Sequence, residues 1–510
     1  MGKVNQLKAG VIISYITTGI NFVIHLIYTP VMIRLLGQSE YGLYTLVSSV
    51  IGYLSLFSLG FTGSYLRFYS KCSKDESAVA KLNGLYLIIF TIMALICFIC
   101  GMFLTDNAAV VFGDRLTENE INRAALLMRI LVINVSLTFP NSVFDSVITA
   151  HERFVFQRLL NLACIVFNPL IALPLLLMGY RSVALVVITS IFTVLKLVIN
   201  IVFSLSRLGV RFNFRGFDFS LFKEMWTFSF FIFLNMIIDQ TNWSVDKFIL
   251  GRVSGTNSVA IYGVAAALFT LYLEFSSMIS NVFAPRVNKI AAGGKTDLNK
   301  DFTDLMIKVG RIQFCVLSLV LTGFVFFGKY FIVNIYSTIE YKEAYYVALF
   351  LMVPATISGS QTIGIEIQRS VNKHQFRSIV YFFMAVLNVF ISIPLARMYG
   401  PAGAAFGTTL SIVIANGFIM NIYYHTGIGI NVIEFWKNIL SLSKGIVLPV
   451  IFGIVIYSYI EGANVVIFCI LIVVYTLFFS ISLYLIGLND YEKNLIKQPI
   501  NLICSRIKRR

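Results

Sequence analysis

Charged side chains are scarce in this chain. They make up 13 % of its 510 residues, whereas soluble domains carry roughly a quarter. Hydrophobic residues make up 58 %, and the mean hydropathy is +0.84. Apolar runs of about 20 residues, each long enough to cross a ~30 Å hydrocarbon layer as a helix, recur along the whole length. The sequence therefore excludes a soluble globular protein and predicts an all-α polytopic membrane protein.

Long polar segments are also missing, so the predicted membrane spans follow one another closely. We expect fourteen spans, at residues 9–33, 42–66, 82–105, 122–148, 155–178, 182–206, 224–250, 258–283, 305–328, 343–366, 376–398, 401–424, 445–461 and 464–487. The connecting loops are short, which leaves no room for a sizeable soluble domain. The N-terminal run is too long for a signal-peptide core and is expected to be an uncleaved first span.

Clustered metal-ligating residues are absent from the sequence. The four histidines lie far apart, and Cys97 and Cys100 form a Cys-x-x-Cys pair inside an apolar span with no second pair nearby. A zinc or redox site needs such residues in groups, so these cysteines are better explained as packing residues. We expect no cofactor and no metal.

The net charge of +16 is spread over many loops. An even number of spans puts both termini on one side of the membrane, and most of the 40 lysines and arginines fall on that side. By the positive-inside rule this side is the cytoplasm. A dispersed charge fits topology and attraction to membrane lipid head groups, so nucleic acid is not an expected partner.

The chain contains an internal repeat. Residues 167–186 (FNPLIALPLLLMGYRSVALV) align with residues 387–406 (LNVFISIPLARMYGPAGAAF) at an offset of 220, and residues 20–37 align with residues 234–251 at an offset of 214. Six spans separate the copies, so the repeats run parallel. Parallel six-helix bundles are typical of alternating-access transporters. We expect lobes at 1–215 and 216–430, followed by two extra helices and a basic cytoplasmic tail at 431–510.

Polar residues recur at steps of three and four in five predicted spans, which places them on one face of each helix. The five sets are Ser14, Thr18, Asn21 and His25; Asn134, Thr138, Asn141 and Asp145; Thr189, Thr193, Lys196 and Asn200; Asn235, Asp239, Asn242 and Asp246; and Thr270, Glu274, Ser277 and Asn281. An ionisable group facing lipid costs roughly 2.5–3.5 kcal/mol. The faces therefore predict a water-filled lumen, with interhelical hydrogen bonds and local ion pairs, such as Lys196 with Glu274, as the alternative.

Cations in such a lumen suit a phosphorylated or acidic ligand. The substrate-binding candidates are Arg34, Arg129, Lys196, Lys247, Asn21 and Asn235. The candidates for coupling a proton or Na⁺ are Asp239, Glu274 and His25. For the two carboxylates the reason is that burial can raise the pKa of a carboxyl group toward neutrality. For the arginines nearest the outer leaflet, contact with lipid head groups is the alternative role.

Two segments carry a family resemblance. Residues 34–71 (RLLGQSEYGLYTLVSSVIGYLSLFSLGFTGSYLRFYSK) resemble the connection between spans 1 and 2 of polysaccharide flippases. Residues 393–411 (IPLARMYGPAGAAFGTTLS) resemble the connection between their spans 11 and 12. With spans arranged as six plus six plus two, the chain resembles a Wzx-type flippase of the multidrug/oligosaccharidyl-lipid/polysaccharide (MOP) superfamily.

The resemblance implies a V-shaped architecture like that of MATE and MurJ transporters, and a non-enzymatic function in a bacterial inner (cytoplasmic) membrane. The implied substrate is an undecaprenyl-diphosphate-linked oligosaccharide, moved from the cytoplasmic to the outer leaflet for O-antigen or capsule synthesis. The resemblance also implies coupling of transport to H⁺ or Na⁺. It further implies that the protein works with a polysaccharide polymerase and a chain-length regulator.

Three other functions stay open. A lipid II flippase would be expected to have a more arginine-rich cavity, and a multidrug exporter of the superfamily usually has only twelve spans. A membrane polysaccharide polymerase or glycosyltransferase would need a sizeable catalytic domain or a large outer loop. The longest outer loop, residues 106–122, is short, and no Asp-x-Asp motif lies in a sizeable cytoplasmic domain.

Overall fold

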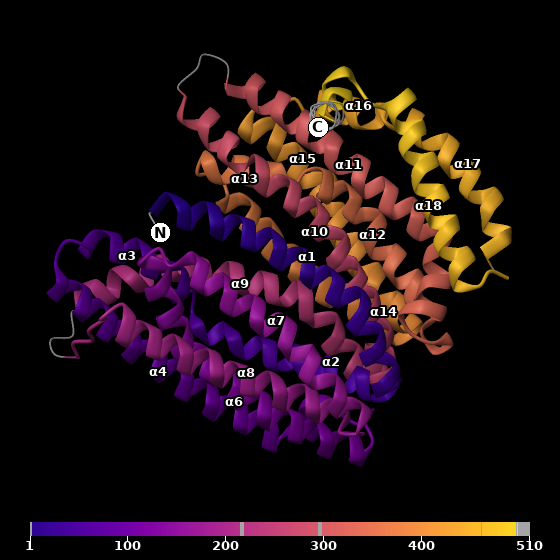
Figure 1. Cartoon of the computed structure of the whole chain (residues 1–510). Coiled ribbons are helices and arrows are strands. Elements are labelled where there is room, and N and C mark those ends of the chain that lie inside the picture. Colours follow the sequence, from indigo (N-terminus) through magenta and orange to yellow (C-terminus); the bar gives the residue numbers. More distant parts are fainter. Residues whose placement is uncertain (1–2, 215–218, 294–297, 461, 496, 498–510) are drawn as a thin grey trace, which may run out of the picture. The chain divides into compact units, whose positions relative to one another are not determined.

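The protein is all-helical. A computed structural model describes residues 3–214, 219–293, 298–460, 462–495 and 497, and within these ranges it contains helices and loops but no β-strand (Figure 1). The predicted fold class is thereby confirmed. The helices form two compact units, one of Met1–Gly263 with Ala396–Pro401 and the other of Val264–Leu395 with Ala402–Arg510. The predicted lobe boundaries, which describe the repeat, stay a prediction.

The bounds of the helices follow the chain order. The first unit holds α1 (Lys3–Leu36), α2 (Gln38–Leu54), α3 (Phe61–Cys72), α4 (Glu76–Asp106), α5 (Ala108–Phe112), α6 (Glu118–Ala150), α7 (Phe154–Leu177), α8 (Arg181–Val202) and α9 (Phe219–Ser254). Most of α10 (Thr256–Ala292) belongs to the second unit. The rest of that unit contains α11 (Leu298–Tyr330), α12 (Ala344–Ser360), α13 (Ile363–Ser370), most of α14 (Gln375–Ile412), α15 (Met420–Tyr423), α16 (Val432–Ser441), α17 (Ser443–Ile460) and α18 (Val465–Ser482).

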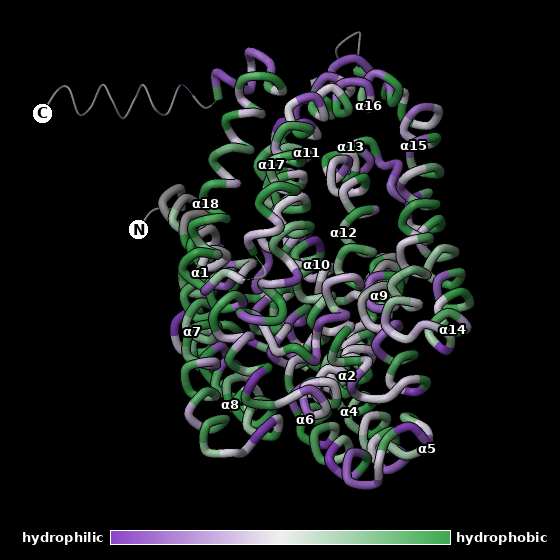
Figure 2. Tube along the Cα trace, turned by 90° about the vertical axis from the view of Figure 1, so that its right-hand side faces the viewer, coloured by the Kyte–Doolittle hydropathy of each residue, from purple (hydrophilic) through white to green (hydrophobic). Residues whose placement is uncertain are grey.

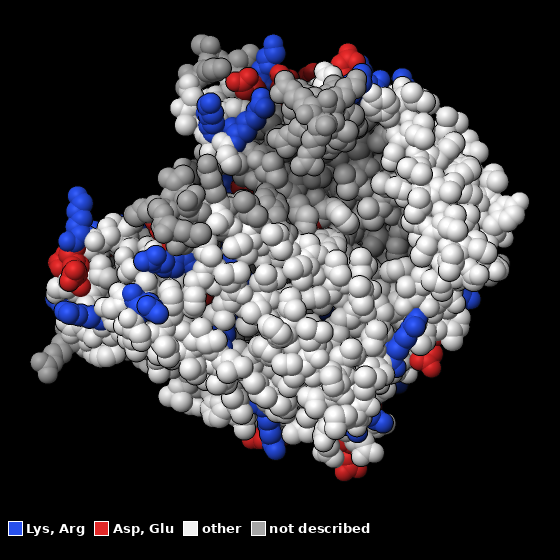
Figure 3. Space-filling model, in the orientation of Figure 1, with Lys and Arg blue, Asp and Glu red and all other residues white. Residues whose placement is uncertain are grey.

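Most of these helices are suited to a membrane. Among the described residues, eleven helices are long and apolar enough to span it, or up to twelve if the bent pair Ile339–Ser360 and Ile363–Ser370 counts as one span. Hydrophobic residues follow the helices in Figure 2, and charged side chains gather toward the margins of the face shown in Figure 3. This pattern makes the protein a multi-pass membrane protein.

The number of spans depends on how two segments are counted. One of the eleven, Gln375–Ile428, has 54 residues, or about 80 Å of helix, more than twice the thickness of the hydrocarbon layer. Its backbone breaks at Gly400, where φ is 58°. The long helix α9 is not among the eleven. The predicted number of fourteen spans stays a prediction.

In the first unit, α6 packs against α2, α4 and α8, while α7 packs against α1 and α9 packs against α2 and α3. Small residues bring neighbouring helices close together. A Cβ on Gly101 of α4 would lie 2.6 Å from a methyl carbon of Val132 on α6. Close backbone approach of this kind supplies much of the packing between helices in lipid, where no hydrophobic effect drives their association.

The second unit holds the two helices that extend beyond the repeat. Phe326 and Phe327 of α11 form a buried cluster with Phe468, Tyr475 and Phe479 of α18. The ring of Tyr475 lies edge-on to the rings of Phe326 and Phe327, with centroid distances of 5.9 and 5.5 Å. These distances are within the range of favourable aromatic pairs. Aromatic packing therefore attaches the C-terminal pair to α11.

A buried ion pair strengthens this attachment. The guanidinium of Arg311 on α11 donates to both carboxylate oxygens of Glu492, over 2.6 and 2.9 Å. It also donates to the carbonyl oxygens of Asn438 and Gly487. The side chains of Arg311 and Glu492 are only 4 % and 5 % exposed. A bidentate pair of this geometry holds the segment after α18 in one position.

The internal repeat is visible in matched side-chain contacts. Asn168 of α7 donates to the hydroxyl of Thr189 over 3.3 Å, and Asn388 donates to the hydroxyl of Thr408 over the same distance. The two asparagines are the residues that the sequence aligned at an offset of 220. Thr408 lies one residue before the position that matches Thr189 at this offset, so the two copies share the asparagine and an asparagine–threonine contact, but not the same threonine position.

An aromatic stack also occurs in both copies. The rings of Phe156 and Phe203 stack with centroids 3.7 Å apart, and those of Phe376 and Tyr423 stack at 4.1 Å. Both members of each pair are related by 220 residues. The stack fixes the alignment of the two copies near the start of α7 and α14.

The other aligned segment has a different register from the predicted one. Gly37 separates α1 from α2 with φ 77°, and Gly255 separates α9 from α10 with φ 84°. These positive-φ positions between consecutive helices make Gly255, rather than Gly251, the structural match of Gly37. At the resulting offset of 218, Arg34 matches Arg252, and both lie in the last turn of their helices.

The corrected register changes the partner of Asp239 in the repeat. Asp239 matches Asn21, whereas the sequence alignment paired it with His25. The shift is four residues, close to one helical turn, so the polar faces of α1 and α9 still correspond. The weak sequence match could not resolve a displacement of one turn, because the displaced register keeps the same pattern of polar and apolar residues.

Candidate functional site

The polar faces predicted for the fourth and sixth spans meet each other between α6 and α8. The hydrogen bonds run from Asn134 to Ser190 (3.2 Å), from Thr193 to Asn134 (3.1 Å), and from Asn200 to Asn141 (2.9 Å) and Asp145 (3.0 Å). Three of the asparagines are buried. Because the bonded residues keep a nearly constant separation in sequence, α6 and α8 run parallel. For the asparagines, the interhelical hydrogen bonding that was the alternative to a lumen is what the structure shows.

The charged members of this network lie at its edge. Lys196 Nζ is 3.1 Å from Asp145 Oδ2, and both side chains are 23 % exposed. Asp145 also accepts a hydrogen bond from buried Asn200, which fixes the position of the carboxylate. The structure therefore gives Lys196 a partner on the neighbouring helix, which is not the Glu274 suggested by the sequence.

The ammonium group of this pair is not fully enclosed. An ammonium group has three donors, and the ion pair with Asp145 leaves donor capacity on a side chain that is still partly open. A phosphate oxygen could take one of these donors, while Asn200 continues to hold Asp145. The α6–α8 network thus contains one partly exposed ammonium group and one partly exposed carboxylate, both toward the C-terminal ends of these helices.

The candidates on α9 and α10 have different surroundings. Asp239 is exposed, Lys247 is half-buried, and the neighbouring Asp246 is buried and accepts a hydrogen bond from Tyr262 over 2.6 Å. Glu274 is half-buried on α10. The side chain of Asn235 lies outside the described residues. The sequence placed Asp246 on the polar face of this span but not among the candidates.

The remaining candidates lie on α1 and α6. Asn21 and His25 are half-buried on α1, and Arg34 is exposed in its last turn. Arg129 pairs with Asp106 over 3.3 Å, with the two side chains 55 % and 62 % exposed. An exposed pair of this kind contributes little to stability, and it leaves the guanidinium of Arg129 open to other partners.

A second polar cluster, which the sequence analysis missed, joins the N-terminal ends of α2, α6, α8 and α10. Glu40 is buried, and it pairs with Arg123 over 2.5 Å and accepts a hydrogen bond from Ser182. Glu120 accepts hydrogen bonds from Ser39 over 2.7 Å and from Thr256 over 2.8 Å. The capping-box spacing of Thr117 and Glu120 was a usable signal for the start of α6, but the partners on other helices come from tertiary packing.

Comparisons with known proteins agree with this fold. Residues 7–291 match the family described as "Polysaccharide biosynthesis protein". A Shigella flexneri protein named "Putative O-antigen transporter" is 19 % identical over 391 residues, which cover 75 % of this chain and 89 % of that protein.

Solved structures of the same fold belong to transporters. The lipid II flippase MurJ in an inward closed conformation aligns with a TM-score of 0.71 at 16 % identity, covering 95 % of this chain and all of that one. An inward-facing MATE family multidrug resistance transporter of the MOP superfamily aligns with a TM-score of 0.63 at 13 % identity, covering 80 % and 94 % of the two chains.

These matches confirm the resemblance to MOP-superfamily transporters on which the sequence analysis relied. The solved structures share the fold, and the family match covers the first unit and the start of the second. The chain belongs to the polysaccharide biosynthesis protein family.

Proposed function

We propose that the protein is a flippase that moves undecaprenyl-diphosphate-linked oligosaccharide repeat units from the cytoplasmic to the outer leaflet. The repeat units would serve O-antigen or capsule synthesis. Membership of the polysaccharide biosynthesis family and the fold shared with MOP transporters support this proposal. The observation that carries it is the partly open Lys196–Asp145 pair, which joins α6 and α8 toward their C-terminal ends.

The substrate chemistry requires such a group. A sugar diphosphate is strongly hydrated, and crossing a ~30 Å hydrocarbon layer without polar partners is prohibitive. In a low-dielectric setting an ammonium group donates strong, charge-assisted hydrogen bonds to phosphate oxygens. In the proposed mechanism the ammonium group of Lys196 donates to a phosphate oxygen in place of Asp145. The protein alternates between inward- and outward-open forms, and the lipid tail stays in hydrocarbon throughout.

The other candidates have proposed roles in the same cycle. Asn21, Asn235, Arg34, Arg129 and Lys247 would contact the sugar or the diphosphate. Asp239, Glu274 and His25 would bind and release the coupling H⁺ or Na⁺, which makes alternation directional. The protein would work in a bacterial inner membrane with both termini in the cytoplasm, beside a polysaccharide polymerase and a chain-length regulator.

Cells that lack their own repeat-unit flippase provide the test. Expression of this protein should restore labelling of lipid-linked repeat units at the outer leaflet, and Lys196→Met should abolish it at normal protein levels. Lys74→Met removes an exposed lysine outside the predicted spans and should leave labelling unchanged. Full labelling with Lys196→Met would remove Lys196 from the mechanism, and no labelling with the wild-type protein would refute the proposed function.

A lipid II flippase is the second candidate function, because the fold matches MurJ over the whole of that chain. The two functions share a carrier lipid but differ in the sugar. Rescue of cells depleted of their lipid II flippase, without restored labelling of polysaccharide repeat units, would favour this second function.

A further inference from the structure

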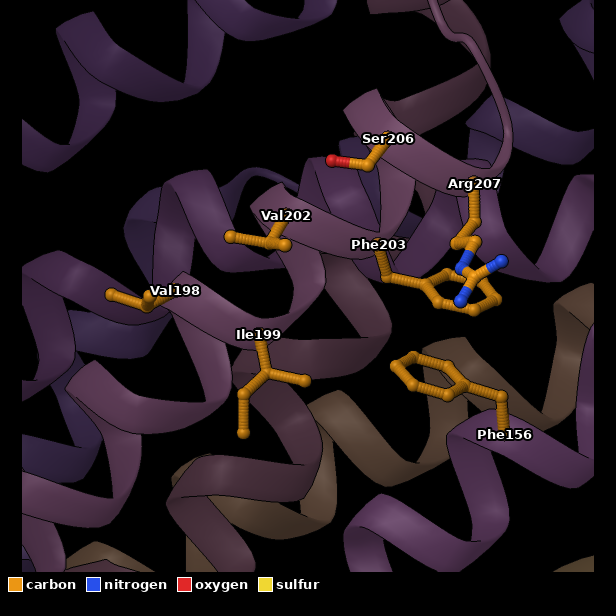
Figure 4. A pocket seen from close by; sticks show the side chains of 7 residues that line it. All are labelled: Phe156, Val198, Ile199, Val202, Phe203, Ser206 and Arg207. Carbon is orange, nitrogen blue, oxygen red and sulfur yellow. The ribbon is translucent and has the colours of Figure 1, made fainter.

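A groove on the first unit runs along the end of α8 beside the start of α7. It has a volume of about 320 Å³. The lining residues are Phe156, Val198, Ile199, Val202, Phe203, Ser206 and Arg207 (Figure 4). Val198 and Val202 lie on a different face of α8 from Lys196 and Asn200. Phe203 and Arg207 follow Lys196 and Asn200 at steps of three and four, so this end of the groove continues the polar face toward the end of the helix.

The wall of the groove is apolar along most of its length. Val198 and Val202 are 50 % and 56 % exposed, so they face the surroundings of the unit. The nine-residue step from Val198 to Arg207 corresponds to about 13 Å of helix, close to half of a ~30 Å hydrocarbon layer. With the predicted topology, the groove extends from the cytoplasmic interface toward the middle of the membrane.

One end of the groove is cationic. The Arg207 side chain lies beside the ring of Phe203, which stacks on Phe156 (Figure 4). Arg153 and Arg158, at the start of α7, are exposed as well. Within the described ranges, none of these three arginines forms an ion pair with a carboxylate. The apolar wall therefore ends in positive charge that no carboxylate of the described residues neutralises.

The internal repeat shows that the fold does not need this arginine. The stack of Phe156 on Phe203 recurs as Phe376 on Tyr423. The corresponding segment Tyr424–Ile428 (YHTGI) contains no lysine or arginine, and Gly427 occupies the position that matches Arg207 at an offset of 220. The stack therefore forms without a cation at this position. In the second copy the turn instead meets Lys373, which matches Arg153 at the same offset and donates to the carbonyl oxygen of Gly427.

We propose that this groove binds the phosphate and the first isoprene unit of a polyprenyl-phosphate lipid in the inner leaflet. The phosphate meets Arg207, and the prenyl chain lies along Val198 and Val202. A volume of 320 Å³ is about ten times the ~30 Å³ that one water occupies in the liquid. At that size it has room for about ten non-hydrogen atoms, which corresponds to the five of a phosphate and the first five-carbon unit of the chain. The rest of the prenyl chain continues outside the groove.

This inference rests on the proposed function and extends it, because the groove would collect the carrier lipid before its head group reaches Lys196. A phosphate on a guanidinium makes charge-assisted, bidentate hydrogen bonds. Contact with a single prenyl chain adds apolar burial beside the Phe156–Phe203 stack. Both contributions are local to the groove, so each can be removed separately.

Native mass spectrometry of the full-length protein in detergent tests the inference, with undecaprenyl phosphate and phosphatidylglycerol as probes. We expect preferential binding of undecaprenyl phosphate, weakened about tenfold by Arg207→Gln and similarly by Val202→Trp, which fills the groove. Leu205→Trp is the matched control, because Leu205 is exposed on the same turn but does not line the groove.

Binding that is equal for both lipids, or that is unchanged in Arg207→Gln and Val202→Trp, would overturn the inference. Loss of binding in Leu205→Trp as well would also overturn it, because the effect would then not be specific to the groove. A separate experiment in cells measures whether the wild-type protein restores labelling of lipid-linked repeat units at the outer leaflet. Normal labelling together with unaffected groove variants refutes the groove alone, whereas absent labelling refutes the proposed function.

Discussion

At the scale of single residues, Lys196 and Asp145 carry the proposed chemistry. They lie 51 positions apart in sequence on parallel helices, and their charged groups are 3.1 Å apart. The pair could serve only to join α6 to α8, or it could present an ammonium group to the substrate. These roles predict different behaviour when the two charges are exchanged.

The exchanged variant carries Lys196→Asp together with Asp145→Lys. It keeps an ion pair between α6 and α8, so we expect normal expression and a normal elution profile. It moves the ammonium group to α6, to the position where Asn200 donates a hydrogen bond to Asp145 in the wild-type protein. An ammonium group cannot accept that bond and is displaced from its original helix, so we expect outer-leaflet labelling to fall at least tenfold. Wild-type labelling by this variant would show that the pair has only a structural role.

Arg311 and Glu492 form the most buried ion pair that the structure describes. Removing one member leaves the other charge buried without its partner, which costs roughly 3–5 kcal/mol. Arg311→Met should therefore lower the temperature at which the purified protein loses its folded elution peak. Arg369→Met is the matched control, because its pair with Glu366 is exposed at the arginine (64 %), and it should have little effect. Equal shifts for the two variants would contradict this account.

At the scale of helices, close approach at glycine fixes how α2 meets the start of α10. A Cβ on Gly42 would lie 1.9 Å from the carbonyl oxygen of Thr256, whereas a Cβ on Gly19 of α1 would meet nothing within 4 Å. Gly42→Leu should therefore destabilise the protein by about 1–3 kcal/mol through overpacking. Gly19→Leu should not, as measured by thermal stability in detergent. A tolerated Gly42→Leu would show that the two helices separate readily.

The helices and their polar faces were predictable from the sequence, because apolar length and three-four spacing are local properties. The pairing of those faces was not. Nothing in the spacing of Asn134, Asn141 and Asp145 indicates that their partners lie on α8, 55 to 59 residues away. The register of α1 and α9 was misplaced by one turn for a related reason, since only the backbone at Gly37 and Gly255 distinguishes the alternatives.

A break in the second span was also not predicted. Leu59 and Gly60 both have positive φ, and they separate α2 and a short 3₁₀ turn from α3. Gly60 approaches the carbonyl oxygen of Ser229 on α9 so closely that a Cβ would lie 2.5 Å from it. The sequence around Gly60 is apolar and reads as continuous helix, so the break depends on packing against α9.

At the scale of the whole molecule, the distribution of lysine and arginine predicts the topology. Both termini should lie in the cytoplasm. A fluorescent protein fused to the C-terminus should fluoresce, because it folds there, and alkaline phosphatase fused at the same point should be inactive. The reverse pattern would mean an odd number of spans or an inverted orientation, and the proposed direction of transport would then have no basis.

The central claim is that this chain alone moves a lipid-linked oligosaccharide across a bilayer. Proteoliposomes with a fluorescent undecaprenyl-diphosphate oligosaccharide in both leaflets test it directly, because a membrane-impermeant quencher reaches only the outer leaflet. With wild-type protein, nearly all of the fluorescence should be quenched with time, and with Lys196→Met the quenching should stop near one half. A stable half-quenched signal with the wild-type protein, under both a proton and a sodium gradient, would contradict the account.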